Sequence, residues 1–417
     1  MIQDPTPPIR LPGSSLPEQS GPRALAFSGE DGDFLRLVAR GAALQLLTFG
    51  FYRFWLVTDV RRHLWSHTSL DGDAFEYAGL GRELVFGFLF ALAILTPVYL
   101  LYFVVGLEVE RLKAFASVPL FLFFFVFQQF AIYRARRYRL TRTIWRGLRF
   151  WMSGSGWSYA LRSSLWLLAV VLTLGLAHPW RVAALERYKL RHTFYGDLQG
   201  RFVATGGALF ARIWWIWLAL AIPLAMLIAA GVVQARHGSI LVDAPVANAL
   251  AGGALIAALI LPLLWPLFRA IEWRWWVEGL RLGDVRAASV LSSGALFGLY
   301  AKFAVIGALV VGVIGFVGLG LGAAAIAWSG LTFDELLQTR GDAFTIALTI
   351  AMFLAYFCAG LAVGALQRYF LQRGLWRAVA TTSFVFHVDA LAAVASRGAA
   401  AHALGEGLAD GLDVAGF

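Results

Sequence analysis

The stretch RYRLTRTIWRGLRFWMSG, residues 137–154, decides the fold, because residues 62–79 read RHLWSHTSLDGDAFEYAG and repeat its pattern. The matched positions are Thr68 and Thr143, Gly72 and Gly147, Phe75 and Phe150, and Gly79 and Gly154. Each stretch follows one apolar segment and precedes another, and this arrangement recurs about five times along the chain. Repeats that alternate with apolar helices predict a repeat-built integral membrane protein.

Each copy carries a basic residue beside an aromatic one, which we call a basic-aromatic knot. The five knots are Arg62-His63, Arg137-Tyr138, Arg187-Tyr188, Arg274-Trp275 and Arg368-Tyr369. Such pairs at helix ends are typical of anchors that bind anionic lipid headgroups at the cytoplasmic face, which is the favoured interpretation. The alternative is a ring of cations around a cytoplasmic vestibule that attracts anionic solutes.

The composition indicates that lipid surrounds most of the chain. Hydrophobic residues make up 59% of it and charged residues 14%, whereas soluble domains are about a quarter charged. The net charge of +10 comes from residues beside helix ends, so we expect contact with lipid and no nucleic acid. Because Cys358 is the single cysteine, an internal disulfide and a cysteine-based metal site are excluded.

Six segments are long and apolar enough to cross a bilayer as helices. They are residues 84–107, 114–133, 209–233, 246–267, 296–328 and 343–366, which form three hairpins. The connections within hairpins hold four Lys/Arg, whereas residues 134–149 between two hairpins carry seven arginines. The positive-inside rule therefore predicts a bacterial inner-membrane protein with cytoplasmic knots and with both termini in the cytoplasm.

Two further apolar stretches, residues 34–49 and 158–173, are short for full spans. Gly50 ends the first, and Gly175 with Pro179 ends the second, so the chain turns at both places. Re-entrant helical hairpins at these two places would keep every basic connection on the cytoplasmic side. The rival topology has eight ordinary spans and a less regular placement of charge.

The segment after each knot is short and rich in aromatic or β-branched residues, as in residues 74–78 and 383–388, which is typical of a strand. These segments could pair into a small cytoplasmic sheet, although the copies near Phe202 and Val285 are degenerate. The predicted fold class is an all-α polytopic membrane protein with repeat-built hairpins and short β-segments. We expect a disordered tail over 1–26, a membrane domain over 27–387, and an amphipathic helix and tail over 388–417.

The chain resembles the YjgN-type bacterial inner-membrane family, a domain of unknown function. The resemblance rests on residues 27–34, FSGEDGDF, on the break TFGFY at 48–52, on Trp55 and Arg61-Arg62, and on DGDAFEYAG at 71–79. It covers most of residues 27–414. Arg53-Phe54 departs from the small residue and proline common in the family, which Pro179-Trp180 resembles more closely. The resemblance implies an inner-membrane location and carries no activity.

Catalytic signatures and clustered metal ligands are absent from the sequence, so we expect neither an enzyme nor a cofactor. Polar residues at membrane depth are the better candidates for a site, since burying charge there is costly. They are Lys302, Arg212, Arg269, Glu272, Arg274, Gln128 and Gln129. Snorkelling of these side chains to the interface is the simpler explanation, and Arg269 with Glu272 reads as an i,i+3 ion pair.

Two functions are compatible with these patterns. The leading hypothesis is a transporter or channel-like protein for a small solute, which can be anionic. The alternative is a non-transporting scaffold or lipid-interacting protein that docks a cytoplasmic partner, and a homo-oligomer is allowed in either case. A polar cavity that reaches Lys302 or Arg212 would favour transport, whereas a solid apolar bundle would favour the scaffold.

Overall fold

The computed structural model describes residues 21–108, 113–237, 245–329, 343–392 and 394–397. Its strands are β1 (Arg23–Phe27), β2 (Thr68–Leu70), β3 (Asp73–Ala74), β4 (Glu76–Tyr77), β5 (Thr143–Trp145), β6 (Leu148–Met152), β7 (Thr193–Tyr195), β8 (Leu198–Phe202), β9 (Leu280–Leu282), β10 (Val285–Ser289) and β11 (Ser383–Phe386). They form one 11-stranded antiparallel sheet, which is larger than the small sheet expected, so the all-α label is not confirmed.

The sheet is nearly closed on itself. Its order is β3-β2-β1-β11-β10-β9-β8-β7-β6-β5-β4, and the two edge strands β3 and β4 are separated in the chain by Phe75 alone. The Phe75 N–H donates to the Thr68 carbonyl at 2.9 Å, and the Ala78 N–H donates to the Arg142 carbonyl at 2.8 Å. The strands therefore surround a barrel-like interior in which almost every edge is paired.

Two-residue turns build this sheet. Asp71-Gly72 and Arg146-Gly147 both have positive φ at each residue, which matches the type I′ turns that best join twisted strands. Gly196 and Gly283 take positive φ at the first position of the other two turns. The copies near Phe202 and Val285, which looked degenerate, thus form regular hairpins, β7–β8 and β9–β10.

The two ends of the described chain complete the ring. Strand β1 pairs with β2 on one side and with β11 on the other, so the first and last strands lie next to each other. β1 begins at Arg23, inside the region where a disordered tail was expected, and residues 1–20 lie outside the described residues. The helix expected after 388 is a single 3-10 turn, Val388–Leu391, followed by irregular chain over 394–397; residues 398–417 also lie outside the described part.

Apolar side chains fill the barrel interior. Each hairpin contributes to one buried cluster, which comprises Leu70, Trp145, Tyr195, Val285, Val385, Val388 and Leu391. Val394 packs against this cluster, and the Ala395 N–H donates to Asp197 Oδ1 at 3.2 Å, so the chain after β11 crosses the end of the barrel that carries the turns. The barrel is therefore a packed core that is closed at this end.

Helices connect the hairpins of the sheet. They are α1 (Asp31–Leu47), α2 (Arg53–Ser66), α3 (Gly81–Glu108), α4 (Lys113–Thr141), α5 (Gly156–Leu172), α6 (His178–Arg191), α7 (Gly206–His237), α8 (Pro245–Ile260), α9 (Trp265–Gly279), α10 (Ser293–Ser329), α12 (Ala343–Leu366) and α13 (Gly374–Thr381). A 3-10 turn over 261–264 joins α8 to α9, and a π-helical stretch over 367–373 joins α12 to α13. We call α2, α4, α6, α9 and α13, which lead into strands, the descending helices, and α1, α3, α5, α7 and α10 the ascending helices.

Close to the sheet, the helices pack in a recurring way. Phe54 of α2, Leu84 of α3 and Tyr138 of α4 share one buried cluster. In this cluster the ascending helix α3 packs with the descending helices α2 and α4. Further clusters of this kind join α4–α5–α6, α6–α7–α9, α9–α10–α13 and α1–α2–α13. This layer therefore holds the bases of the ascending and descending helices against one another.

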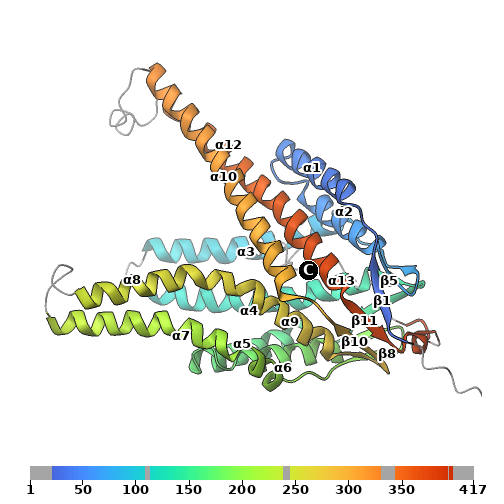
Figure 1. Cartoon of the computed structure of the whole chain (residues 1–417). Helices are drawn as coiled ribbons and strands as arrows, with labels where there is room; N and C mark the ends of the chain where they lie inside the picture. The colour runs from blue at the N-terminus through green and yellow to red at the C-terminus, as the bar shows by residue number, and fades with distance from the viewer. Residues whose placement is uncertain (1–20, 109–112, 238–244, 330–342, 393, 398–417) are drawn as a thin grey trace, which may run out of the picture.

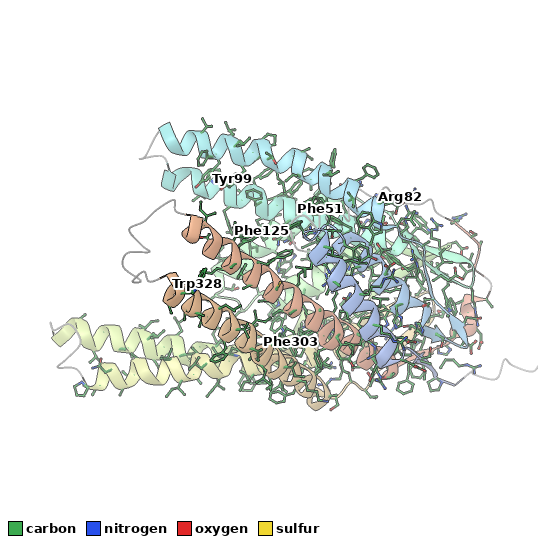
Figure 2. All side chains as sticks on the ribbon, turned by 90° about the horizontal axis from the view of Figure 1, so that it is seen from above. Phe51, Arg82, Tyr99, Phe125, Phe303 and Trp328 are labelled. Atoms are coloured by element: carbon green, nitrogen blue, oxygen red, sulfur yellow. The ribbon has the colours of Figure 1, made fainter. Side chains whose placement is uncertain are left out.

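Farther from the sheet, three long hairpins diverge. In Figure 1 the hairpin α10–α12 points away from α3–α4 and α7–α8, and the view in Figure 2 separates these last two, so the three hairpins extend from the sheet as separate pairs. Six helices are long and apolar enough to cross a membrane, and between 0% and 28% of each apolar window is buried within the protein. The six predicted spans are confirmed as helices of this kind, and their side chains face outward where lipid would lie.

Two hairpins, α1–α2 and α5–α6, are shorter. Thr48 accepts from the Tyr52 N–H at 3.0 Å while its hydroxyl donates to the Leu44 carbonyl, and Thr173 makes the same pair of bonds. Gly50 and Gly175 follow with φ of +89° and +92°, a conformation that favours glycine. Phe51, at this turn, lies nearer the sheet in Figure 2 than Tyr99 and Trp328 on the long hairpins.

Candidate functional site

A buried charged group joins three descending helices, α4, α6 and α9. We call it the Glu186 cluster, and its members are Arg136, Glu186, Lys189, Glu272 and Trp276. Glu186 is 9% exposed and accepts from the Trp276 indole at 3.0 Å and from Arg136 Nη1 at 3.5 Å. Lys189, one turn along α6, forms an ion pair with the same carboxylate. Glu272 interacts electrostatically with both Glu186 and Lys189.

The electrostatics of Glu186 follow from its donors. Burial alone would raise the pKa of this carboxyl, but the charges of Lys189 and Arg136 and the hydrogen bonds of Lys189 and Trp276 outweigh it. The pKa of Glu186 is therefore held below its ordinary value, and the side chain is an anion with three partners. Such a group orients its cations firmly and is costly to break by removing one member.

Arg269 and Glu272 form the i,i+3 ion pair that the sequence indicates. The Arg269 guanidinium also lies between two indoles, 5.8 Å from the Trp265 ring centre and 5.7 Å from that of Trp273. Arg269 therefore extends the Glu186 cluster along α9, toward a zone rich in tryptophan. Tryptophans near the end of a membrane-spanning helix, such as these two on α9, are typical of a membrane interface.

A second polar group connects α4, α5 and α6. Ser163 is fully buried; its hydroxyl donates to Gln129 Oε1 at 2.8 Å and accepts from Arg181 Nη2 at 3.1 Å. Burial lowers the pKa of Arg181, and no carboxylate among the described residues forms an ion pair with it. Gln128, beside Gln129, is half-buried and lies outside this chain of bonds.

The remaining predicted residues are not brought together. Lys302 is exposed on α10, and Arg212 on α7 forms an exposed ion pair with Glu278 at 3.0 Å. Arg274 Nη1 donates to the Leu291 carbonyl at 2.9 Å. A single site that contains Lys302, Arg212 and Arg274 is therefore not formed.

The basic-aromatic knots fasten neighbouring units to one another. Aromatic side chains of the knots bind the chain just after the preceding hairpin: Tyr138 donates to Glu83 at 2.5 Å, Tyr188 to the Ser155 carbonyl at 3.0 Å and Trp275 to the Thr205 carbonyl at 3.0 Å. Arg62 binds the chain after its own hairpin, at the Gly79 carbonyl. Arg137 is half-buried, and Arg187 is exposed.

The fifth knot departs from this arrangement. In the other copies the aromatic residue lies five positions before the strand, as in Tyr138 and Thr143. Arg368 and Tyr369 instead lie on the π-helical stretch, and α13 follows before β11 begins at Ser383. Tyr369 packs on Phe34, and the position equivalent to the other knot arginines is Arg377, which pairs with Asp31 at 3.5 Å.

Sequence reasoning missed most of the Glu186 cluster. Glu186 directly precedes the Arg187-Tyr188 knot, and Trp276 directly follows the Arg274-Trp275 knot, so both were hidden within segments already given a role. An acidic residue inside an otherwise basic helix end was the available signal. Among the described residues, no group of three or more His, Cys, Asp or Glu is placed to hold a metal ion.

Comparison with known proteins gives one match. Neither the curated proteins nor the solved structures contain a match to this chain. Residues 22–411 match the family described as bacterial protein of unknown function, DUF898, which is the YjgN family. The match extends from β1 to beyond the last described residue and so includes the whole ring of strands and helices. This chain therefore belongs to the DUF898 family.

Proposed function

We propose that this protein is a lipid-interacting protein of the inner membrane, and that it does not conduct solute along the axis of its barrel. The observation that carries this proposal is the packed barrel interior. Trp145 is 2% and Tyr195 1% exposed there, and the two rings lie 5.8 Å apart. A path along the axis would have to displace this apolar core, which costs several kcal/mol for each large side chain.

The outer halves of the long hairpins support the same proposal. Phe316 on α10 is 80% exposed and Tyr356 on α12 is 80% exposed. A transporter usually surrounds its pathway with helices that contact one another, whereas these hairpins diverge, as Figures 1 and 2 show together. Side chains of this kind would be solvated by acyl chains on most of their surface.

The short hairpins give the protein a second contact with lipid. Leu47 and Phe49 at the first tip are 76% and 79% exposed, and Leu172 and Leu174 at the second are 75% and 81% exposed. We propose that both hairpins are re-entrant, so that each tip enters the near leaflet and returns. Arg53, at 4.9 Å from the Phe54 ring centre, would remain close to the headgroups.

The proposed orientation places the sheet in the cytoplasm. The four two-residue turns and the knots then lie on the side where Lys and Arg gather, as the positive-inside rule requires. Both termini would lie on this side, because β1 and β11 are neighbours in the sheet. The basic surface at the helix bases would attract anionic lipid headgroups.

Lipid retention with a flux control tests the proposal. The full chain would be purified in mild detergent, and its bound lipids would be identified by native mass spectrometry. The same protein in sealed vesicles would be tested for flux of small anions. We expect anionic phospholipids to remain bound and the flux to equal that of empty vesicles. Flux above that level, without retained lipid, would contradict the proposal.

Transport of a small solute that can be anionic is the second candidate, and the Glu186 cluster favours it. Ionisable residues buried near the membrane interface often mark a solute or proton pathway. In this case Glu186→Gln should abolish flux, whereas Glu76→Gln, on an exposed strand position, should leave it unchanged. A Glu186→Gln protein that folds normally and shows the same vesicle flux as wild type would rule this candidate out.

A further inference from the structure

Three arginines lie side by side on the outer face of the barrel. The register pairs Arg201 of β8 with Arg281 of β9, and Arg281 with Arg286 of β10. Leu198, Leu282 and Val285 on the same strands pack against the barrel core. Because successive side chains of a strand point to opposite faces, the three arginines point away from that core. We call them the arginine row.

The row is electrostatically unfavourable as it stands. Like charges directly opposite one another across strands are destabilising. Among the described residues, none of the three arginines forms an ion pair with a carboxylate, and Glu278, which lines the pocket beside them, pairs with Arg212 at 3.0 Å. Burial and then the charge of Arg286 lower the pKa of Arg281, so neighbouring cations of the row act on each other. An anion between them would remove this repulsion.

Hydrogen bonds fix the orientation of one arginine of the row, and a pocket lies beside it. Arg281 Nη1 donates to the Glu278 carbonyl at 2.9 Å and to the Leu280 carbonyl at 2.7 Å, which fixes its guanidinium. Beside it lies an open pocket of about 330 Å³, lined by Glu278, Arg281, Arg286, Phe386 and His387 among others, in which the two arginines outnumber the one carboxylate. This volume lies within the usual range of small-ligand pockets. A pre-oriented guanidinium loses little entropy when it binds an anion.

We propose that the arginine row and its pocket bind a phosphate group, carried by a lipid headgroup or by a soluble phosphate ester. Several arginine forks on one face match the oxygens of a phosphate better than a monovalent halide. In the proposed orientation the row lies on the side of the sheet that faces the bilayer, because Arg281 follows the end of α9 by two residues and Arg201 precedes α7 by five. The headgroup form of this proposal rests on the proposed lipid function, whereas the soluble form does not.

The first test measures thermal stability of the full chain in phosphatidylcholine nanodiscs, with inorganic phosphate or with sodium chloride of equal ionic strength. We expect phosphate to raise the melting temperature of the wild type more than chloride does. Arg286→Gln should melt higher than wild type without phosphate, since repulsion is relieved, and should lose the phosphate shift. Arg149→Gln is the matched control, because Arg149 lies opposite Ile144 and has no cationic neighbour in its register. Its phosphate shift should equal that of wild type.

The second test replaces inorganic phosphate with phosphatidylglycerol in the nanodiscs. If phosphatidylglycerol raises the melting temperature of the wild type, if Arg286→Gln loses this shift, and if inorganic phosphate gives no shift, the ligand is the lipid headgroup. A shift with inorganic phosphate alone identifies a soluble ligand. Two outcomes would overturn the proposal. In the first, the melting temperature shifts equally in wild type and Arg286→Gln with both ligands. In the second, phosphate and chloride change the melting temperature equally and phosphatidylglycerol does not change it. Native mass spectrometry of Arg286→Gln separates the phosphate site from the proposed lipid function. If the variant still retains lipid, that lipid is bound elsewhere, and the proposed function stands even if the phosphate site fails.

Discussion

The barrel and the long hairpins are two apolar regions that satisfy opposite demands. In the barrel, Trp145 and Tyr195 are buried by other parts of the same chain. On α10, none of the most apolar 18-residue window is buried by the protein. The barrel is held by hydrophobic burial and packing as in a soluble domain, whereas the hairpins satisfy their backbone internally and leave side chains to lipid. The same apolar residue types therefore contribute differently to the free energy of folding in the two regions.

The largest expected effect comes from emptying the barrel. Trp145 also donates from Nε1 to the Asp73 carbonyl at 3.2 Å and stacks 6.0 Å from Phe75. Trp145→Ala should lower the free energy of unfolding by about 4 kcal/mol. Denaturation in detergent, followed by tryptophan fluorescence, measures the change. Phe316→Ala, on the exposed face of α10, should cost less than about 1 kcal/mol under the same conditions. Equal costs would refute the contrast.

The next effect concerns closure of the ring. Arg373 is buried, pairs with Asp31, and donates to the Gly29 carbonyl at 2.8 Å, so it ties the π-helical stretch just before α13 to the segment after β1. Arg373→Ala should cost about 3 kcal/mol, because it breaks a buried charged network. Hydrogen exchange should speed up first in β1 and β11. Arg36→Ala breaks the exposed pair with Asp33 and should change stability by less than about 0.5 kcal/mol. Unchanged protection of β1 in Arg373→Ala would contradict this role.

A pH dependence sharpens the contrast at the base of α2. Burial first, and then the charges of His67 and Arg373, lower the pKa of His63 to about 4 from 6.5. The unfolded chain therefore takes up this proton at a higher pH than the folded one, so stability falls as pH drops from about 6.5 to 4. We expect a loss on the order of 1 to 2 kcal/mol, reduced from the full linkage value by partial exposure.

His63→Phe should flatten this part of the stability profile, because the titrating group is gone while the contact with Phe34 is kept. His387→Asn, at an exposed position with left-handed backbone, is the control and should keep the wild-type slope. Urea denaturation at several pH values measures both. A slope that persists in His63→Phe would assign the effect to another group.

The smallest expected effect lies in the short hairpins. Gly175 has φ of +92° at the turn between α5 and α6, with the Trp217 indole nitrogen 3.7 Å from the place of an added Cβ. Gly175→Ala should cost about 1 kcal/mol through backbone strain, since the space itself is sufficient. Gly207→Ala, in the first turn of α7 with open space around it, should be neutral or slightly stabilising. A cost as large in Gly207→Ala would show that the turn conformation is not the cause.

Sequence patterns predicted the long elements well and the short ones poorly. The six spans and the family are confirmed, because length and hydropathy identify spans without tertiary information. Strands after the knots and a small sheet were predicted, but the two strands of each hairpin and the closure of the sheet were not, since strands of three residues such as β2 and β5 carry little periodic signal. β1 was hidden by the proline-rich segment before it.

The candidate site was predicted only where its partners are close in sequence. Arg269 and Glu272 lie one turn apart, so their pairing could be predicted from spacing. Glu186 meets Arg136 and Trp276 across α4, α6 and α9, and nothing in one sequence gives the register between these helices. The arginine row was missed for the same reason, because it depends on the pairing of β8, β9 and β10.

Thiol labelling in intact cells tests the central claim most directly, namely that the whole sheet lies on one side of the bilayer and that the short hairpins do not cross. Single cysteines would replace Ser66, Asp284 and Phe51, and Ser239 in the connection of a long hairpin, in a Cys358→Ser background. With a membrane-impermeant reagent, we predict labelling at position 239 in intact cells, at 66 and 284 only after permeabilisation, and at 51 in neither case. Labelling of 66 and 284 from opposite sides, or of 51 from outside, would contradict the account.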